Sequence, residues 1–171
     1  MSDDCLMPTS VGEVVELSEK MSGSQFCRQK GLVREADCLA VLLAGNCLGL
    51  SPIESVQLVS IRDCDVVVGI SVLIKMAQKQ PDYMDLFWIN TDESGATAQL
   101  NRDGVEPIRE SYSWEDARDD GLTELQSFER RGVLMMKGMA TEKVIRKAYP
   151  SMCKGLLTEL QHILSTRPEH D

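Results

Sequence analysis

The stretch of residues 83–113, YMDLFWINTDESGATAQLNRDGVEPIRESYS, decides the expected fold class. It contains three strand-like segments, YMDLFWIN, ATAQLNR and EPIRESYS. The turn-forming groups TDESG and DG separate them. Strands joined by such short turns pair antiparallel. The stretch therefore predicts a three-strand antiparallel meander.

The residues before the meander predict helices and one hairpin. A short helix is expected at 10–21, where Ser10 precedes Glu13 in the pattern of a capping box. The strongest helix signal is at 36–48, and Gly49 followed by Pro52 favours its end. Its apolar residues recur at helical spacing: Ala36, Leu39, Ala40, Leu43 and Cys47. Residues 55–69 predict a hairpin that turns at 62–65 and leads into a short helix ended by Pro81.

The residues after the meander predict helices. Ser113 is an expected N-cap, with Asp116 three residues later. A helix is expected at 133–148, and Pro150 ends it before a last helix in 151–165. The order predicts an α+β fold, in which an antiparallel sheet of hairpin plus meander is covered by helices on one side. The expected divisions are an N-terminal arm or short helix at 1–33, a core domain at 34–165 and a tail at 166–171.

Composition limits the class of protein. The 171 residues are 43% hydrophobic and 26% charged, as in an ordinary globular protein. We find no apolar run of about 18 residues that would span a bilayer, and no basic start typical of a signal peptide. The six cysteines form no CxxC, so we expect reduced thiols rather than a disulfide scaffold or a zinc site. These features predict a cytoplasmic location in a bacterial cell.

Positive charge gathers near the C-terminal end of an acidic chain. The formal net charge is −9, but residues 128–156 carry about +5, which leaves about −14 for the rest. This basic segment supplies most of the candidate site residues: Arg130, Arg131, Lys137, Lys143, Arg146 and Lys147. Affinity for nucleic acid depends on the local field at the phosphates, so a negative total does not exclude binding there.

Helical spacing separates the roles expected within the basic segment. One face of the expected helix is an apolar stripe formed by Val133, Ala140, Val144 and Ala148. Lys137 lies on the same stripe, and we expect its aliphatic stem to pack while its ammonium faces outward. Arg146 lies away from the stripe, so we expect its loss to change stability by less than about 0.5 kcal/mol. Three interpretations stay open: a solvated basic face, a surface for phosphates, or a complement to the acidic remainder.

The search for catalytic chemistry gives no candidate centre. The chain has no P-loop, GxSxG, HExxH or GxGxxG motif. Its two histidines, His162 and His170, lie in the expected last helix and the tail, away from any nucleophile. We therefore expect no enzyme, no cofactor and no metal site. Trp88 and Trp114 are compatible with stacking on nucleobases, although strand aromatics more often belong to a core.

Four motifs in a fixed order resemble the RecT family of phage single-strand annealing proteins, which includes the lambda Bet-like members. They are a helix ending in GLSP (49–52), a hairpin leading into VVVGISVLIKMAQK (66–79), the helix start YSWEDA (112–117), and a basic helix running through Arg146 and Tyr149-Pro150 to GLLT (155–158). The resemblance covers residues of about 35–158.

The resemblance implies a function and its site. It implies binding of single-stranded DNA along its backbone, ATP-independent strand annealing in recombination, and assembly into rings or filaments. It places Arg146, Lys137 and Lys75 at basic positions of the family. It also implies a nuclease or a single-strand-binding protein, from phage or host, as a further partner. The acidic composition and the lack of a long apolar run predict no membrane partner.

The chain departs from the family pattern in ways that favour a second hypothesis. The basic helix opens with ERRGVLMM, where two basic positions are apolar, and the W-x-x-YP phrase is missing. The hairpin turn is RDCD rather than the frequent NGK, and little follows GLLT. The alternative is a RecT-derived acidic interaction protein that acts as a DNA mimic or inhibits a host DNA-binding or defence complex. A third hypothesis is an unrelated α+β binding module.

Overall fold

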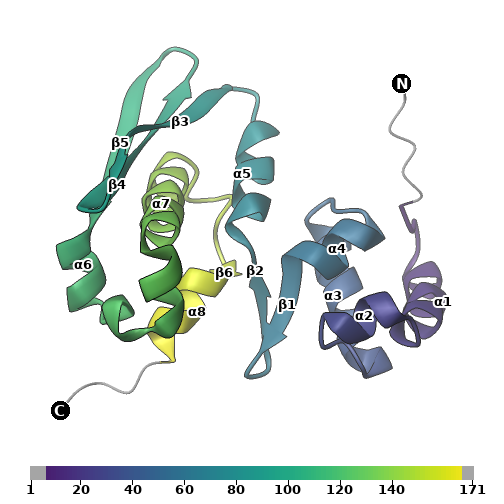
Figure 1. The fold of residues 1–171 in the computed structure, drawn as a ribbon. Helices are drawn as coiled ribbons and strands as arrows, with labels where there is room; N and C mark the ends of the chain where they lie inside the picture. The colour runs from purple at the N-terminus through teal and green to yellow at the C-terminus, as the bar shows by residue number, and fades with distance from the viewer. Residues whose placement is uncertain (1–6, 167–171) are drawn as a thin grey trace. The chain divides into compact units, whose positions relative to one another are not determined.

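The computed structural model describes residues 7–166 and divides the chain into two compact units (Figure 1). The first unit is Met1–Gly69 and the second is Ile70–Asp171. The sequence analysis expects boundaries at 33/34 and 165/166 instead. The residues expected to form an arm belong to the first unit, because helix α1 (Val11–Ser22) packs against helix α3 (Glu35–Cys47). The expected tail lies almost wholly outside the described residues.

The first unit begins with four helices. They are α1 (Val11–Ser22), α2 (Gln25–Gln29), α3 (Glu35–Cys47) and α4 (Pro52–Leu58). The predicted cap of α1 is confirmed, because the Ser10 hydroxyl accepts a hydrogen bond from the Glu13 backbone N–H at 3.2 Å. Helix α3 ends as predicted just before Gly49, which has the positive φ of 67° that glycine tolerates best.

Helix α4 corrects the expected hairpin, whose first strand was predicted to include residues 56–58. Ser51 and Glu54 form a capping box: each side chain accepts a hydrogen bond from the other residue's backbone N–H. Pro52 occupies the first helical turn, where its missing N–H costs nothing. The Ser-Pro-x-Glu sequence thus starts a new helix, and the alternation at 56–61 misled the prediction.

A hairpin of β1 (Val59–Arg62) and β2 (Asp65–Val68) completes the first unit. Arg62 pairs with Asp65, so the turn has only two residues, within the predicted 62–65. Both turn residues have positive φ, 47° at Asp63 and 73° at Cys64. Two such residues are typical of a type I′ turn, for which glycine is the favoured second residue.

The second unit begins with α5 (Ile70–Gln78) and the predicted meander. The strands are β3 (Tyr83–Asp92), β4 (Gly95–Arg102) and β5 (Val105–Ser113), and they pair antiparallel in the order β3-β4-β5. The following elements are α6 (Trp114–Asp119), a 3₁₀ turn η1 (Leu122–Glu124), α7 (Gln126–Ala148), the short strand β6 (Leu157–Thr158) and α8 (Glu159–Ser165).

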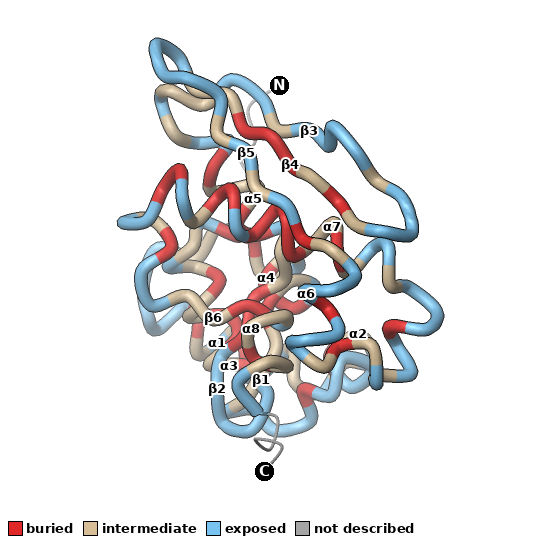
Figure 2. The backbone as a smooth tube through the Cα atoms, turned by 90° about the vertical axis from the view of Figure 1, so that its left-hand side faces the viewer, coloured by how far each residue is buried: buried red, intermediate tan, exposed pale blue. Residues whose placement is uncertain are grey.

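Helix α7 packs across all three strands of the meander and forms the core of the second unit with them (Figure 1). On β4, alternate residues face α7 and are buried: Ala96, Ala98 and Leu100. They meet the buried side of α7, which includes Met136, Ala140, Val144 and Ile145. β3 is an edge strand, and Figure 2 shows it largely exposed.

The structure confirms the α+β class and the antiparallel strands, and it corrects two details. The hairpin and the meander belong to separate sheets, so the single sheet predicted for both is wrong. The predicted last helix begins only at Glu159. The preceding residues 151–155 form turns, with Gly155 at a φ of 78°.

Among residues 7–166, no single helix is long and apolar enough to cross a bilayer. Helices α3 and α4 reach that length and composition only as a pair, and they are bent by 108° at the break between them.

The β1–β2 turn gives a stability prediction. The Cys64→Gly change should raise the free energy of unfolding by about 1 kcal/mol, because it removes a side chain from the left-handed region. The measurement is the midpoint of urea denaturation beside the parent chain. The converse change is Gly104→Ala in the β4–β5 turn, which adds a side chain at a positive φ of 67° where nothing lies within 4 Å of the new Cβ. It should lower the free energy of unfolding by about 1 kcal/mol, because the left-handed conformation disfavours a Cβ. A stabilising Gly104→Ala or a destabilising Cys64→Gly would contradict this account of the turns.

Candidate nucleic-acid interface

Two lysines of α7 interact through their ammonium groups with side chains of β5. The Lys147 ammonium pairs with the Glu110 carboxylate, and the Lys143 ammonium lies 4.8 Å from the centroid of the Tyr112 ring. Lys143 also helps to hold the pKa of Asp116 below its usual range, after the larger effect of hydrogen bonds from Ser113. These predicted site residues therefore help to dock the helix on the sheet.

Lys137 lies over an aromatic ring of β3. Its ammonium is 4.0 Å from the centroid of the Trp88 ring, and the Trp88 indole N–H donates to the Thr141 hydroxyl at 3.2 Å. A cation over an indole face is an attractive contact. The predicted packing of the Lys137 stem is compatible with its half-buried position, and its charge lies at the edge of a pocket described below.

Arg146 is held on several sides by its own unit. Its Nε donates to Glu142 at 2.7 Å, and the Glu142 side chain is only 5% exposed. The other Glu142 oxygen accepts from the Thr158 hydroxyl at 2.7 Å. The guanidinium also donates to three acceptors beyond the helix: the carbonyl oxygens of Cys153 (3.3 Å) and Leu156 (2.9 Å) and the side-chain oxygen of Gln161 (2.6 Å).

These contacts correct the expectation that Arg146 is a dispensable surface residue. Its side chain is 25% exposed, and its three guanidinium nitrogens all make hydrogen bonds within the protein. A phosphate would have to compete with a buried carboxylate for this group. The structure therefore gives Arg146 an architectural role, which is to tie α7 to the 153–161 segment.

Arg130 and Arg131 differ from the other cations of α7. Both are exposed, and the described part of the chain offers neither of them a hydrogen bond or an ion pair. They lie where α7 is interrupted, since Arg131 has non-helical angles (φ −141°, ψ 24°). Lys75, in the last turn of α5, is half-buried and is not among the residues around these two arginines.

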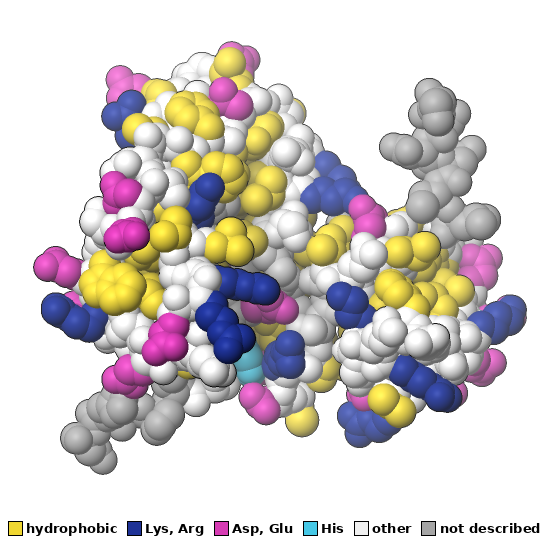
Figure 3. Space-filling model, viewed as in Figure 1, with side chains coloured by type: hydrophobic (Ala, Val, Ile, Leu, Met, Phe, Trp, Pro, Cys, Tyr) yellow, Lys and Arg dark blue, Asp and Glu magenta, His cyan; other side chains and the backbone are white. Residues whose placement is uncertain are grey.

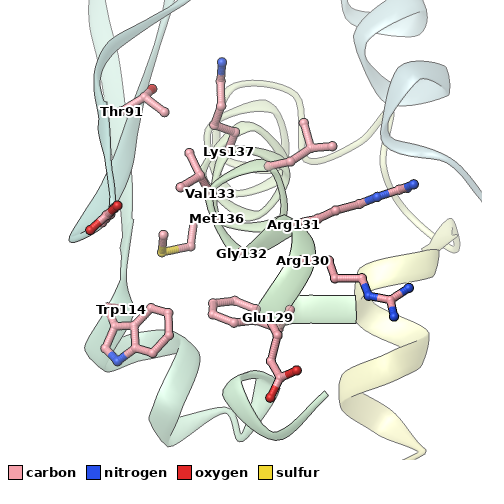
Figure 4. Close-up of a pocket in the computed structure, with 12 residues that line it drawn as sticks. Thr91, Trp114, Glu129, Arg130, Arg131, Gly132, Val133, Met136 and Lys137 are labelled. Atoms are coloured by element: carbon pink, nitrogen blue, oxygen red, sulfur yellow. The ribbon is translucent and has the colours of Figure 1, made fainter. Parts of the chain in front are cut away.

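A pocket of about 770 Å³ lies beside the N-terminal half of α7 (Figure 4). Three of its cations come from that helix: Arg130, Arg131 and Lys137. Trp114 lines it at the start of α6, and Thr91 lines it from β3. The structure thus brings three of the seven predicted site residues to one pocket. Lys75, Lys143, Arg146 and Lys147 lie outside it.

Exposed apolar side chains border this pocket. Leu134 is 63% exposed and Trp114 is 45% exposed. Figure 3, viewed as Figure 1, shows hydrophobic side chains gathered over the region of β3 and α7, with Lys and Arg side chains among them. Two carboxylates, Glu93 and Glu129, also line the pocket, so the surface is mixed rather than uniformly positive.

Gly132 shapes the floor of the pocket. A Cβ there would come within 3.0 Å of the Phe128 ring, so glycine lets this ring lie against the next turn of the helix. The Phe128 ring in turn contacts Trp114, with centroids 5.1 Å apart and planes tilted by 59°. No pattern in the sequence predicts this role of Gly132 in packing.

In the part of the chain that the structure describes, no group of three or more His, Cys, Asp or Glu side chains is placed to hold a metal ion. His170 lies outside the described residues. His162 is buried on α8 and does not line the pocket.

Comparison with known proteins finds no family model and no curated protein that matches the chain. The class that the structure defines is an α+β protein with a basic, partly apolar pocket beside a long helix. The resemblance to the RecT family rests on the order of four motifs, and membership of that family is a proposal.

The Arg146 contacts predict a stability effect. Arg146→Ala should lower the free energy of unfolding by about 3 kcal/mol, because it leaves the Glu142 carboxylate buried without its partner. Lys147→Ala is the control in the same turn of α7, since the Lys147 side chain is 61% exposed and its ion pair should contribute less than about 1 kcal/mol. Urea denaturation followed by circular dichroism measures both. If both changes lower the free energy of unfolding by the same small amount, the architectural role of Arg146 is contradicted.

Proposed function

We propose that the chain is a single-stranded DNA-binding and strand-annealing protein that works without ATP. The observation that carries the proposal is the pocket beside α7, which Lys137 lines together with Arg130 and Arg131, two exposed arginines whose guanidinium groups have no partner among the described residues. Guanidinium groups bind phosphate through paired hydrogen bonds. The order of RecT-like motifs supports the same function independently.

The spacing of the cations suits an extended backbone. Arg130 and Arg131 stand at the interruption of α7, and Lys137 lies six residues after Arg131 in the helix that follows. A strand crossing the pocket along α7 would therefore meet several cations in succession. Binding of this kind reads phosphates rather than bases, which annealing requires because the base edges must stay free to pair.

The net charge of −9 limits where DNA can bind. Like-charge repulsion disfavours contact with the acidic parts of the surface, so affinity must come from the local field around the pocket. Assembly of several subunits along one DNA strand would increase the total affinity, because each subunit would contribute the phosphate contacts of its own pocket. The proposal therefore includes a ring or filament of this chain in the bacterial cytoplasm, with a nuclease or a single-strand-binding protein as a further partner.

The second candidate function is an acidic interaction protein derived from the same family. The observation that favours it is the internal use of the α7 cations, since Arg146, Lys147 and Lys143 face Glu142, Glu110 and Tyr112. Such a protein would block a basic DNA-binding partner instead of binding DNA. It should then reduce the partner's DNA binding in a competition assay.

The DNA-binding proposal predicts a salt-dependent affinity that depends on two arginines. The double change Arg130→Gln and Arg131→Gln should weaken binding of a labelled oligo(dT) strand and reduce the salt slope by about 1.4, because each lost phosphate contact accounts for about 0.7. Fluorescence anisotropy at several salt concentrations gives both quantities.

The matched control is Arg28→Gln with Lys30→Gln, which removes the same charge from exposed positions in the first unit. It should leave the salt slope almost unchanged. If the parent chain does not bind the strand at low salt, the proposed function is wrong. If both double variants lose affinity equally, net charge and not the pocket governs binding.

A further inference from the structure

We infer that the Trp114 indole is a stacking site for one nucleobase of the bound strand. The inference rests on the proposed function, because it concerns the same pocket and the same ligand. It adds a contact to the bases that the cations alone do not supply. The two tryptophans of the chain differ in their contacts.

The two indoles are almost equally exposed, 44% for Trp88 and 45% for Trp114. Exposure therefore does not distinguish them, but their contacts do. Trp88 has its N–H bonded to Thr141 and an ammonium, that of Lys137, 4.0 Å from its ring centroid. The indole N–H of Trp88 and one face of its ring are therefore already occupied by contacts within the protein.

Trp114 has a ring that is fixed but not covered. Its backbone N–H donates to the Ser94 carbonyl at 2.8 Å, and Ser113 just before it caps α6. Phe128 supports the ring from the helix α7. Among the described residues, no hydrogen bond is made by the Trp114 indole N–H. The indole is thus held in place with little conformational freedom left to lose on binding.

Trp114 and the two arginines lie on opposite sides of the start of α7 (Figure 4), so they would contact different nucleotides of one strand. The ring lies on one side of the pocket, and the side chains of Arg130 and Arg131 project from the other side of α7's first turns. Phosphates are favoured near the arginines. They are disfavoured near Glu93 and Glu129, whereas an uncharged base beside Trp114 is not repelled by these carboxylates.

Every base has a face that can stack on an aromatic ring, so this contact is tolerant of sequence. Stacking of one base on Trp114 would fix a single nucleotide per subunit. Its neighbours would remain on the arginines through their phosphates. The site therefore adds affinity without reading sequence, which is compatible with annealing of any complementary pair.

Two single-tryptophan variants separate the indoles. With Trp88→Phe, the remaining Trp114 should lose fluorescence on addition of oligo(dT), because stacking on a base quenches an indole. With Trp114→Phe, the remaining Trp88 should change little. An abasic oligonucleotide of equal length should bind through its phosphates but leave Trp114 unquenched.

Affinity gives an independent readout. Trp114→Leu should weaken oligo(dT) binding roughly tenfold, which corresponds to one base stacked on an aromatic ring, and should leave binding of the abasic strand unchanged. Phe87→Leu is the matched control, because Phe87 is an exposed aromatic residue of β3 that does not line the pocket. It should alter neither affinity.

The outcomes separate this inference from the proposed function. If oligo(dT) and the abasic strand bind the parent equally and Trp114 is not quenched, stacking is wrong while phosphate binding stands. If neither strand binds, the proposed function fails as a whole. A quenched Trp88 with an unchanged Trp114 would overturn the assignment of the stacking site.

Discussion

Glu142 carries its carboxylate into the interior of the second unit, where Arg146 is its ionic partner at 2.7 Å. A carboxylate that is 5% exposed is costly to bury unless a cation and hydrogen bonds compensate it. Arg146 and Thr158 provide both, and the same arginine reaches the backbone beyond the end of α7. The end of the central helix and the segment that follows it are therefore fixed by one group. The position of α7 over the sheet depends on that fixed end.

The pair also explains why positive charge gathers on this segment. Near the C-terminal end of α7, Lys147 and Lys143 contact side chains of β5, and further toward the start of the helix Lys137 lies over the Trp88 ring of β3. Each cation faces an acid or an aromatic ring of the second unit. Of the cations on α7, Arg130 and Arg131, next to the interruption of the helix, have no such partner among the described residues. The interruption thus divides the basic segment into a part that builds the fold and a part that is open to a ligand.

Much of the fold could be predicted from the sequence because its signals are local. The turns TDESG and DG placed the three strands of the meander close to their observed limits, and Ser10 and Ser113 marked two helix starts. The start of α4 was equally local, but its capping serine, Ser51, was taken as part of a turn after α3. The separation of the hairpin from the meander could not be predicted, because strand pairing between distant segments leaves no pattern in either one.

The candidate site was predicted less well, and for a physical reason. Periodicity shows which residues share a helix face, but the partner of a charged side chain comes from elsewhere in the chain. Arg146 was predicted to face solvent because no sequence pattern indicates that its guanidinium would donate hydrogen bonds to acceptors at 153–161. Glu142, one helical turn earlier, was the one partner that its spacing could have indicated. A basic residue with an acid four positions before it should therefore first be considered as half of an ion pair. That criterion sets Arg146 apart from the other six candidate residues, because none of them has an acid three or four positions before it.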